Sequence, residues 1–218
     1  MKIEINLKII LFIILFIMLN KIDIYMLFII FILCHELAHM LIGIFLGFKP
    51  KTLALNPLGV SIEFYNYDEN KKNNCIKRIF TYFAGPISNF VFCFIFCFIN
   101  IDMEKKTQII YTNLLIGSFN LIPILPLDGG KILKEFLKLF YNSKIASIFM
   151  IYFSKSILIA ITLIYSIAIF YMKNIVIFLL IVYLWYLYII EEKRERLIIR
   201  VFEIIENTRE NKSNNIEN

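Results

Sequence analysis

The sequence predicts an all-α polytopic membrane protein with about six transmembrane helices and a short β-hairpin-like segment between the second and the third. Of the 218 residues, 60% are hydrophobic and 18% are charged, and the mean hydropathy is +0.75. A soluble domain would normally be about half apolar and about a quarter charged. One soluble core could not bury this excess of apolar side chains, so we expect the lipid bilayer to surround much of the chain.

Six apolar segments can be judged against the roughly 20 residues that a helix needs to cross a bilayer. By residue number they are 7–19, 24–48, 79–99, 107–127, 156–172 and 174–190. The first is short, and the boundary between the last two is poorly marked. We expect residues 1–190 to form one six-span membrane domain.

The distribution of Lys and Arg predicts the orientation of the spans, because cytoplasmic connections carry more of both. If the N-terminus is cytoplasmic, most of these residues fall in connections on the inner side. The outer connections then hold only Lys21, Lys105, Lys106 and Lys173. Both termini are therefore expected in the cytoplasm.

Two connecting segments carry a structural signal of their own. Residues 52–65 combine β-prone residues with an Asn-Pro-Leu-Gly turn signal, which predicts a short hairpin at the cytoplasmic membrane face. Residues 191–206 alternate in charge and carry apolar residues at helical spacing, which predicts a cytoplasmic amphipathic helix on the membrane surface or against a partner. Residues 207–218 are polar and are expected to be disordered.

The net charge of +6 does not indicate a nucleic-acid partner, because the basic residues occur in short clusters between apolar runs instead of along one face. The four cysteines show no metal-ligand spacing. We interpret them as small packing residues; they are Cys34, Cys75, Cys93 and Cys97.

The second apolar segment contains the motif His35-Glu36-Leu-Ala-His39, which holds both histidines of the chain. Residues four apart share one face of a helix, so both imidazoles could reach one metal ion. Glu36 lies beside that face and could take a proton from a water molecule that the metal activates. The alternative is a pair of packed histidines. Ionisable groups at membrane depth are costly and rarely incidental, which favours a zinc site.

Two histidines leave a zinc ion short of ligands, and the candidate for the third is Asp128 at the end of the fourth segment. Pro123 and Pro126 interrupt helical hydrogen bonding before it, and two glycines follow it. Broken helix at membrane depth is tolerated where it lines a cavity or is buried in protein. Alternatively, Asp128 could cap a helix at the interface.

The predicted orientation places both motifs in the same half of the membrane. The second and fourth spans both run from outside to inside, and each carries its polar motif toward the inner end. Water from the cytoplasm could then reach the site.

In these motifs the sequence resembles the site-2 protease family of intramembrane zinc metalloproteases over most of its length. The likeness rests on His35-Glu-Leu-Ala-His39, Ala84-Gly-Pro-Ile-Ser-Asn89 and the stretch from Asn120 through Asp128 to Gly130. The branch it is most similar to acts in sporulation, where a membrane-associated sigma-factor precursor is processed. The six-span layout and the charged stretch after the last span also resemble that branch.

The resemblance implies a bacterial cell-membrane enzyme that binds one zinc ion per chain through His35, His39 and Asp128, with Glu36 as the general base. It implies that Asn89 and Asn120 contact the substrate, although a buried Asn can equally bond a neighbouring membrane helix. The implied partners are the lipid bilayer, a membrane-associated protein substrate and inhibitory membrane proteins. The substrate could pair as an added strand with the 52–65 segment.

Two other functions are compatible with a membrane metal site. A metal transporter would be expected to place further polar ligands on several spans, often within an inverted repeat, and the sequence shows neither. A non-catalytic relative that only binds membrane proteins would not need a general base, and Glu36 is present.

Overall fold

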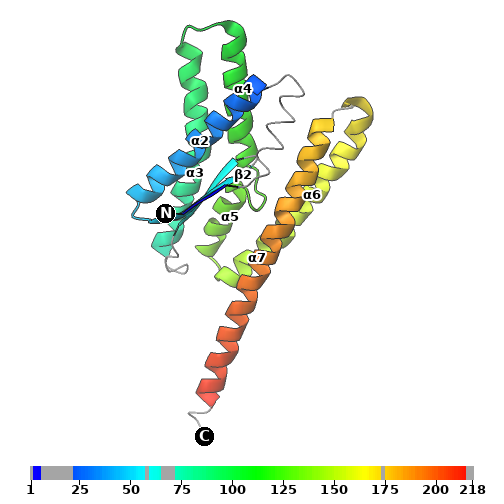
Figure 1. Ribbon diagram of the computed structural model, residues 1–218. Helices are drawn as coiled ribbons and strands as arrows, with labels where there is room; N and C mark the ends of the chain where they lie inside the picture. The colour runs from blue at the N-terminus through cyan, green and yellow to red at the C-terminus, as the bar shows by residue number, and fades with distance from the viewer. Residues whose placement is uncertain (1, 6–21, 57–58, 65–71, 173–174, 215–218) are drawn as a thin grey trace. The chain divides into compact units, whose positions relative to one another are not determined.

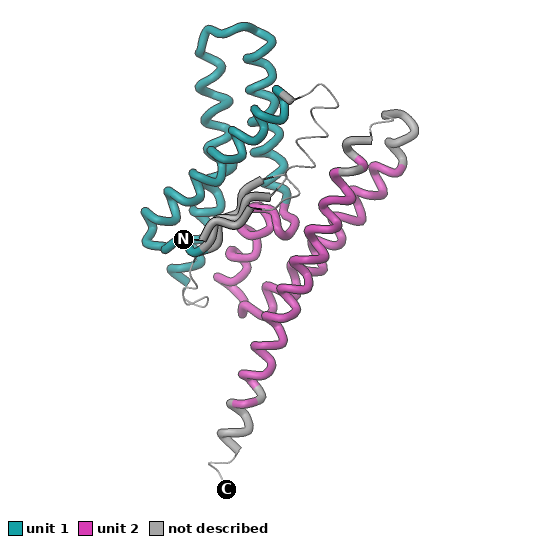
Figure 2. Tube along the Cα trace, viewed as in Figure 1, with its two compact units in different colours: residues 1–122 teal, residues 123–218 magenta. Residues whose placement is uncertain are grey.

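The computed structural model describes residues 2–5, 22–56, 59–64, 72–172 and 175–214. The described chain is mostly helical and forms two compact units, Met1–Ile122 and Pro123–Asn218 (Figure 2). The first expected span, residues 7–19, lies outside the described residues.

Three helices build most of the first unit: α2 (Ile22–Phe45), α3 (Lys72–Phe98) and α4 (Met103–Asn120) (Figure 1). Helix α3 packs against both α2 and α4. Phe31 of α2 lies in the core between them, with its ring centroid 5.6 Å from that of Phe92 and 6.1 Å from that of Phe96. Large apolar side chains also cover the outer faces of these helices, as expected where lipid is the solvent.

A three-stranded sheet completes the first unit, in the order β1 (Lys2–Ile5), β2 (Pro50–Asn56) and β3 (Gly59–Phe64). Strands β2 and β3 are antiparallel and fall in the region where the sequence predicts a hairpin; residues 57–58 between them are outside the described chain. Strand β1 was not expected from the sequence; it pairs in parallel with β2. The Phe64 ring lies against Phe48, with centroids 5.8 Å apart, and connects the end of β3 to the end of α2.

The second unit consists of α5 (Asp128–Lys138), α6 (Ser143–Met172) and α7 (Ile175–Asn214). Helix α6 packs against α5 and α7. The Tyr188 hydroxyl of α7 donates to the Ile151 carbonyl of α6 at 3.1 Å, and the Trp185 Nε1–H donates to Thr162 Oγ1 at 3.0 Å. The two long helices are thus joined by polar contacts as well as by apolar packing.

The ends of several helices differ from the expected ones. Helix α3 begins at Lys72 instead of residue 79, and α6 begins at Ser143 instead of residue 156. The expected amphipathic helix 191–206 is the continuation of α7, which remains helical to Asn214 where the sequence analysis expects disorder from residue 207. Ion pairs one turn apart, such as Arg196 with Glu192, support the polar part of α7.

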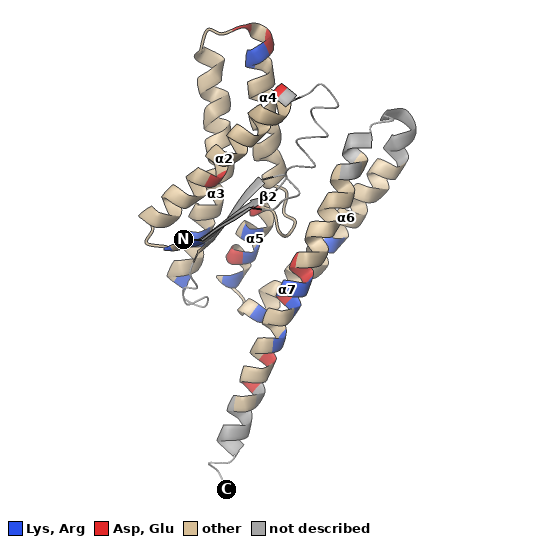
Figure 3. Cartoon of the chain, in the orientation of Figure 1, with Lys and Arg blue, Asp and Glu red and all other residues tan. Residues whose placement is uncertain are grey.

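Three of the described helical segments are long and apolar enough to cross a membrane: Asp23–Phe45, Lys72–Phe98 and Ser143–Ser166. The expected count of six spans is therefore not confirmed. Helix α4 is short and carries Glu104, Lys105 and Lys106 at its start. Figure 3 shows that charged residues are sparse along α2, α3 and α6 and gather on α5 and on the C-terminal half of α7.

Candidate metal centre

Helix α2 places the two histidines of the motif side by side in the interior of the first unit. Both are buried, and their ring centroids are 4.7 Å apart with planes at 86°. The Nε2 atoms are separated by 3.1 Å. The spacing of four residues therefore produces the convergence that the sequence predicts, with one nitrogen of each ring directed to a common point.

Helix α3 holds the other nitrogen of each ring. The His39 Nδ1–H donates to the Thr81 carbonyl oxygen at 2.7 Å, and Asn89 Nδ2 lies 3.2 Å from His35 Nδ1. A carbonyl oxygen can only accept, so the proton of neutral His39 is on Nδ1 and its Nε2 carries a lone pair. Metal-binding histidines are typically held in this way through the nitrogen that does not face the metal.

Gly85 allows α3 to approach the two imidazoles closely. A Cβ atom at this position would lie 2.6 Å from His35 Nε2 and would collide with the His39 ring as well. Real Cβ atoms do not approach other heavy atoms so closely. Hence the glycine of the Ala84-Gly-Pro motif is required by the histidine pair, a role that the sequence alone does not reveal.

Asn89 is completely buried on α3, next to the histidines instead of at an open surface. Its Oδ1 atom has no hydrogen-bond partner among the described residues. A buried polar atom without a partner costs about 1–3 kcal/mol, so such a group calls for an explanation. The structure thus brings one of the two expected substrate-binding residues to the histidine pair.

Glu36, the expected general base, is the residue after His35 on α2 and is half-buried. Its side chain is therefore more accessible than the two imidazoles. This difference is consistent with a group that exchanges protons with water or substrate.

Asn120 is the last residue of α4 and is half-buried. Its side-chain Nδ2 donates to the Ile116 carbonyl of the same helix at 3.1 Å. This hydrogen bond is local to α4.

Asp128 begins α5 in the second unit and is 6% exposed. A carboxylate in the first turn of a helix is stabilised by the unpaired backbone N–H groups there. Lys131 Nζ lies 3.5 Å from Asp128 Oδ1 and adds a further favourable charge. The helix end and the Lys131 ammonium thus both place positive charge beside this carboxylate.

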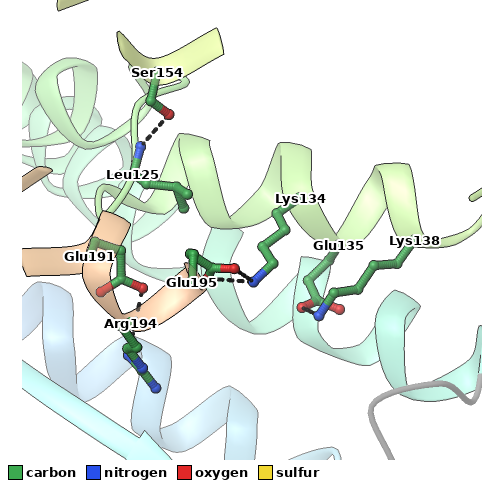
Figure 4. A network of polar contacts seen from close by, with 8 residues as sticks. All are labelled: Leu125, Lys134, Glu135, Lys138, Ser154, Glu191, Arg194 and Glu195. Carbon is green, nitrogen blue, oxygen red and sulfur yellow. Dashed lines mark hydrogen bonds and ion pairs between the residues drawn. The ribbon is translucent and has the colours of Figure 1, made fainter. Parts of the chain in front are cut away.

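The segment before Asp128 is fixed by hydrogen bonding and close packing. The Leu125 N–H donates to the buried Ser154 Oγ of α6 at 3.0 Å (Figure 4). Gly130 packs so closely on the backbone of Ile124 that a Cβ there would lie 2.5 Å from it. These contacts hold the start of α5 against the preceding Pro-rich turn.

A buried ion pair connects α5 to α7. Lys134 Nζ donates to both carboxylate oxygens of Glu195, at 2.5 and 2.6 Å, and the two side chains are 11% and 4% exposed (Figure 4). Burial lowers the pKa of Lys134 below its usual value, and the attraction of Glu195 opposes this effect. This pair could not be predicted from the sequence, because Lys134 and Glu195 each stand in a charged stretch that resembles a solvated face.

The residues present fit a zinc ion. Two neutral imidazole nitrogens converge, their outer nitrogens are held by α3, and a glycine leaves room beside them. A carboxylate such as Asp128 is a ligand of the type that completes His₂-carboxylate sites.

Together, the fold and the histidine pair define a helical membrane protein with a buried metal-binding motif. Residues 24–108 and 106–165 match the model of Peptidase family M50. The chain belongs to this family, the site-2 protease family, and the resemblance expected from the sequence is thereby confirmed.

Two curated relatives match about half of the chain. Stage IV sporulation protein FB of Bacillus subtilis is 31% identical over 107 residues, covering 47% of this chain and 36% of the relative. A zinc metalloprotease of Methanocaldococcus jannaschii is 28% identical over 118 residues, covering 51% of this chain and 33% of the relative. The matched region thus spans about a third of the length of either relative.

Among solved structures, the site-2 protease from Methanocaldococcus jannaschii is similar with a TM-score of 0.68 and 23% sequence identity. The match covers 87% of this chain and 90% of that chain. At this identity the similarity shows a shared fold.

Proposed function

We propose that this chain is an intramembrane zinc metalloprotease that hydrolyses peptide bonds of membrane-associated proteins. The observation that carries the proposal is the buried pair of Nε2 atoms 3.1 Å apart on an apolar helix, with each ring held from α3. Membership of Peptidase family M50 and the zinc metalloprotease among the relatives support the same conclusion.

In this proposal His35, His39 and Asp128 hold one zinc ion per chain. The zinc would supply Lewis acidity that activates a water molecule and polarises the scissile carbonyl. Glu36 accepts the proton of the attacking water and later delivers it to the leaving amine. Asn89 and Asn120 are the candidates for a direct substrate contact.

The sheet of the first unit is the proposed docking element for the substrate. A transmembrane substrate hides its carbonyl groups in helical hydrogen bonds, so it must unwind before cleavage. Strands β1 and β3 are the two edges of the sheet, and an unwound segment could add to one of them as a further strand. The inhibitory membrane proteins implied by the family resemblance remain part of the proposal.

The biological role that we propose is regulated cleavage of a membrane-bound transcription factor or sigma-factor precursor during sporulation. The support is the similarity to stage IV sporulation protein FB, a 31% identity over about half of the chain. We place the protein in a bacterial cell membrane with both termini in the cytoplasm.

The test combines zinc analysis with cleavage of a single-span model substrate by the full chain purified in detergent. We expect about one zinc per chain, and Glu36→Gln should retain zinc but lose cleavage by a factor on the order of 10² or more. Asp128→Ala should bind zinc more weakly. Undiminished cleavage by Glu36→Gln would remove Glu36 from the base role. A wild-type chain that binds no zinc after reconstitution would contradict the proposal.

A further inference from the structure

Phe64, the last residue of β3, packs directly on the helix that carries the two histidines. A Cβ atom at Gly43 of α2 would lie 2.5 Å from Phe64 Cζ and 2.7 Å from Phe64 Cε1. The tip of the ring therefore occupies the space that a side chain at position 43 would need. Gly43 is itself buried. The proposed function gives no role to this contact between the sheet and α2.

Gly43 stands on the same side of α2 as the histidine pair. It follows His39 by four residues and His35 by eight, and residues at this spacing share one face of a helix. Four residues rise by about 6 Å along a helix axis. The sheet of the first unit thus meets α2 one turn beyond the nearer imidazole, on the face that carries the proposed metal ligands.

The end of α2 holds the Phe64 ring on a second side. The Phe48 N–H donates to the Gly43 carbonyl at 2.8 Å, and Gly47, at φ +92°, makes the turn that ends the helix. In a helix end of this kind, the residue after the glycine commonly packs on an apolar side chain at the position that Gly43 occupies. Here the Phe64 ring takes that place, with its centroid 5.8 Å from that of Phe48. The ring cannot move away without losing one of its two contacts.

The same corner of the first unit joins the two antiparallel strands. Strand β2 begins at Pro50, two residues after Phe48, and Pro50 is the register partner of Phe64. The last turn of α2 is also fixed from α3, where Lys77 Nζ donates to the Leu46 carbonyl at 3.0 Å. The end of α2, the start of β2 and the end of β3 are thus held together at this corner.

We propose that Phe64 is a positioning residue: its contact with Gly43 sets the distance between the sheet and the histidine pair. That distance selects which peptide bond of a strand-bound substrate reaches the metal site. The inference rests on the proposed function, because it concerns a substrate added to an edge of this sheet. An extended chain advances by about 3.3 Å per residue, so a small displacement of the sheet changes which bond is best placed.

The test uses the full chain in detergent, a single-span model substrate and mass spectrometry of the products. Gly43→Ala adds a methyl group where the Phe64 ring lies, so the ring and the end of β3 must move. We expect wild-type zinc affinity, a kcat lower by about 10–100-fold, and part of the product cut at a neighbouring bond. The KM should change less than kcat, because the edges of the sheet are still present. A wild-type kcat with a single unchanged cut would overturn the proposal.

A second substitution tests whether the contact itself is responsible. Phe64→Leu removes the ring atoms that a Cβ at position 43 would overlap. When it is combined with Gly43→Ala, the cut should return to the wild-type bond and kcat should recover most of its loss. A loss of stability alone would not move the cut. If the double variant cuts at the same displaced bonds as Gly43→Ala, the overlap does not set the position of cleavage.

Phe45 provides a matched control on the same turn of α2. Its side chain is 85% exposed, so Phe45→Ala changes the end of the helix without opening the contact between Gly43 and Phe64. This variant should cut at the wild-type bond, and a displaced cut would contradict a specific role for that contact. A wild-type chain that binds no zinc or cleaves nothing would instead refute the proposed function, so the two failures are distinguishable.

Discussion

At the scale of single residues, the histidine pair depends on the absence of a side chain at Gly85. A Cβ there would overlap the space of both imidazoles, whose Nδ1 atoms are fixed by contacts to α3. The rings could then avoid this overlap only by losing their contacts to α3. The smallest possible substitution on α3 should therefore affect the metal site more than it affects the fold.

We predict that Gly85→Ala lowers zinc affinity by about 10–100-fold, the range found when residues that orient metal ligands are altered. The control is Gly47→Ala, where φ is +92° and a Cβ meets open space. That variant should lose stability, by about 1–2 kcal/mol, because an L-residue is strained at positive φ. Chelator competition and thermal unfolding in detergent measure the two effects. Unchanged zinc affinity in Gly85→Ala would show that the rings can move without cost.

The sequence alone predicts that the two histidines share one face of a helix. It does not predict the residues of α3 that contact them. The spacing of His35 and His39 is a local property of one helix, so it could be predicted without the fold. Thr81 and Asn89 are 42 and 54 residues distant from the histidines they contact. Such contacts depend on how α3 packs against α2, which no spacing in the sequence encodes.

At the scale of the elements, polar residues explain the boundaries that differed from expectation. Helix α3 starts with Lys72, Asn73 and Asn74, and α6 starts with Ser143 and Lys144, so a search for apolar runs begins too late in both. The ion pair between α5 and α7 was not predicted for a similar reason: Glu195 is buried, although it stands within a run of charged residues.

We predict that this buried ion pair holds α5, and with it Asp128, against α7. Lys134→Met or Glu195→Leu alone should destabilise the protein by about 3–5 kcal/mol, because each leaves one charge buried without its partner. The double variant should recover most of that loss. Thermal unfolding in detergent would measure the cycle. Strictly additive losses in the double variant would show that the two residues act independently.

A surface control separates this effect from a general effect of charge. Lys144 bonds the exposed Glu206 at 3.0 Å. Exposed ion pairs contribute little to stability. Lys144→Gln should therefore leave the unfolding transition close to that of the wild type.

The Lys134–Glu195 variants should also lower zinc affinity, because α5 begins at the proposed ligand.

At the scale of the whole molecule, the sheet shows where prediction from sequence ends. Residues 52–65 have the composition of strands, and β2 and β3 occur there. Strand β1 has only four residues and pairs with a segment about 50 positions later, with Lys2 opposite Thr52. A pairing between segments so far apart in the sequence depends on the path of the intervening chain, so it cannot be predicted from local sequence.

Whether α4 crosses the membrane decides the topology of the whole chain. Its 18 residues rise by about 27 Å, close to the roughly 30 Å of a hydrocarbon core, and its three charged residues stand in the first turn. The positive-inside rule places Lys105 and Lys106 outside and the stretch of Lys72, Lys77 and Arg78 inside. We therefore predict that residues 99–102, between α3 and α4, lie on the opposite side from the C-terminus.

Reporter fusions that are active on only one side of the membrane, placed after Asn100 and at the C-terminus of the full chain, test this topology. A reporter of the cytoplasmic side should be active only at the C-terminus, and a reporter of the outer side only after Asn100. A fusion after Asn142, between α5 and α6, should behave like the C-terminal one, because α4 would have returned the chain to the cytoplasm. If it behaves like the fusion after Asn100, α4 does not cross the membrane and the predicted topology is wrong.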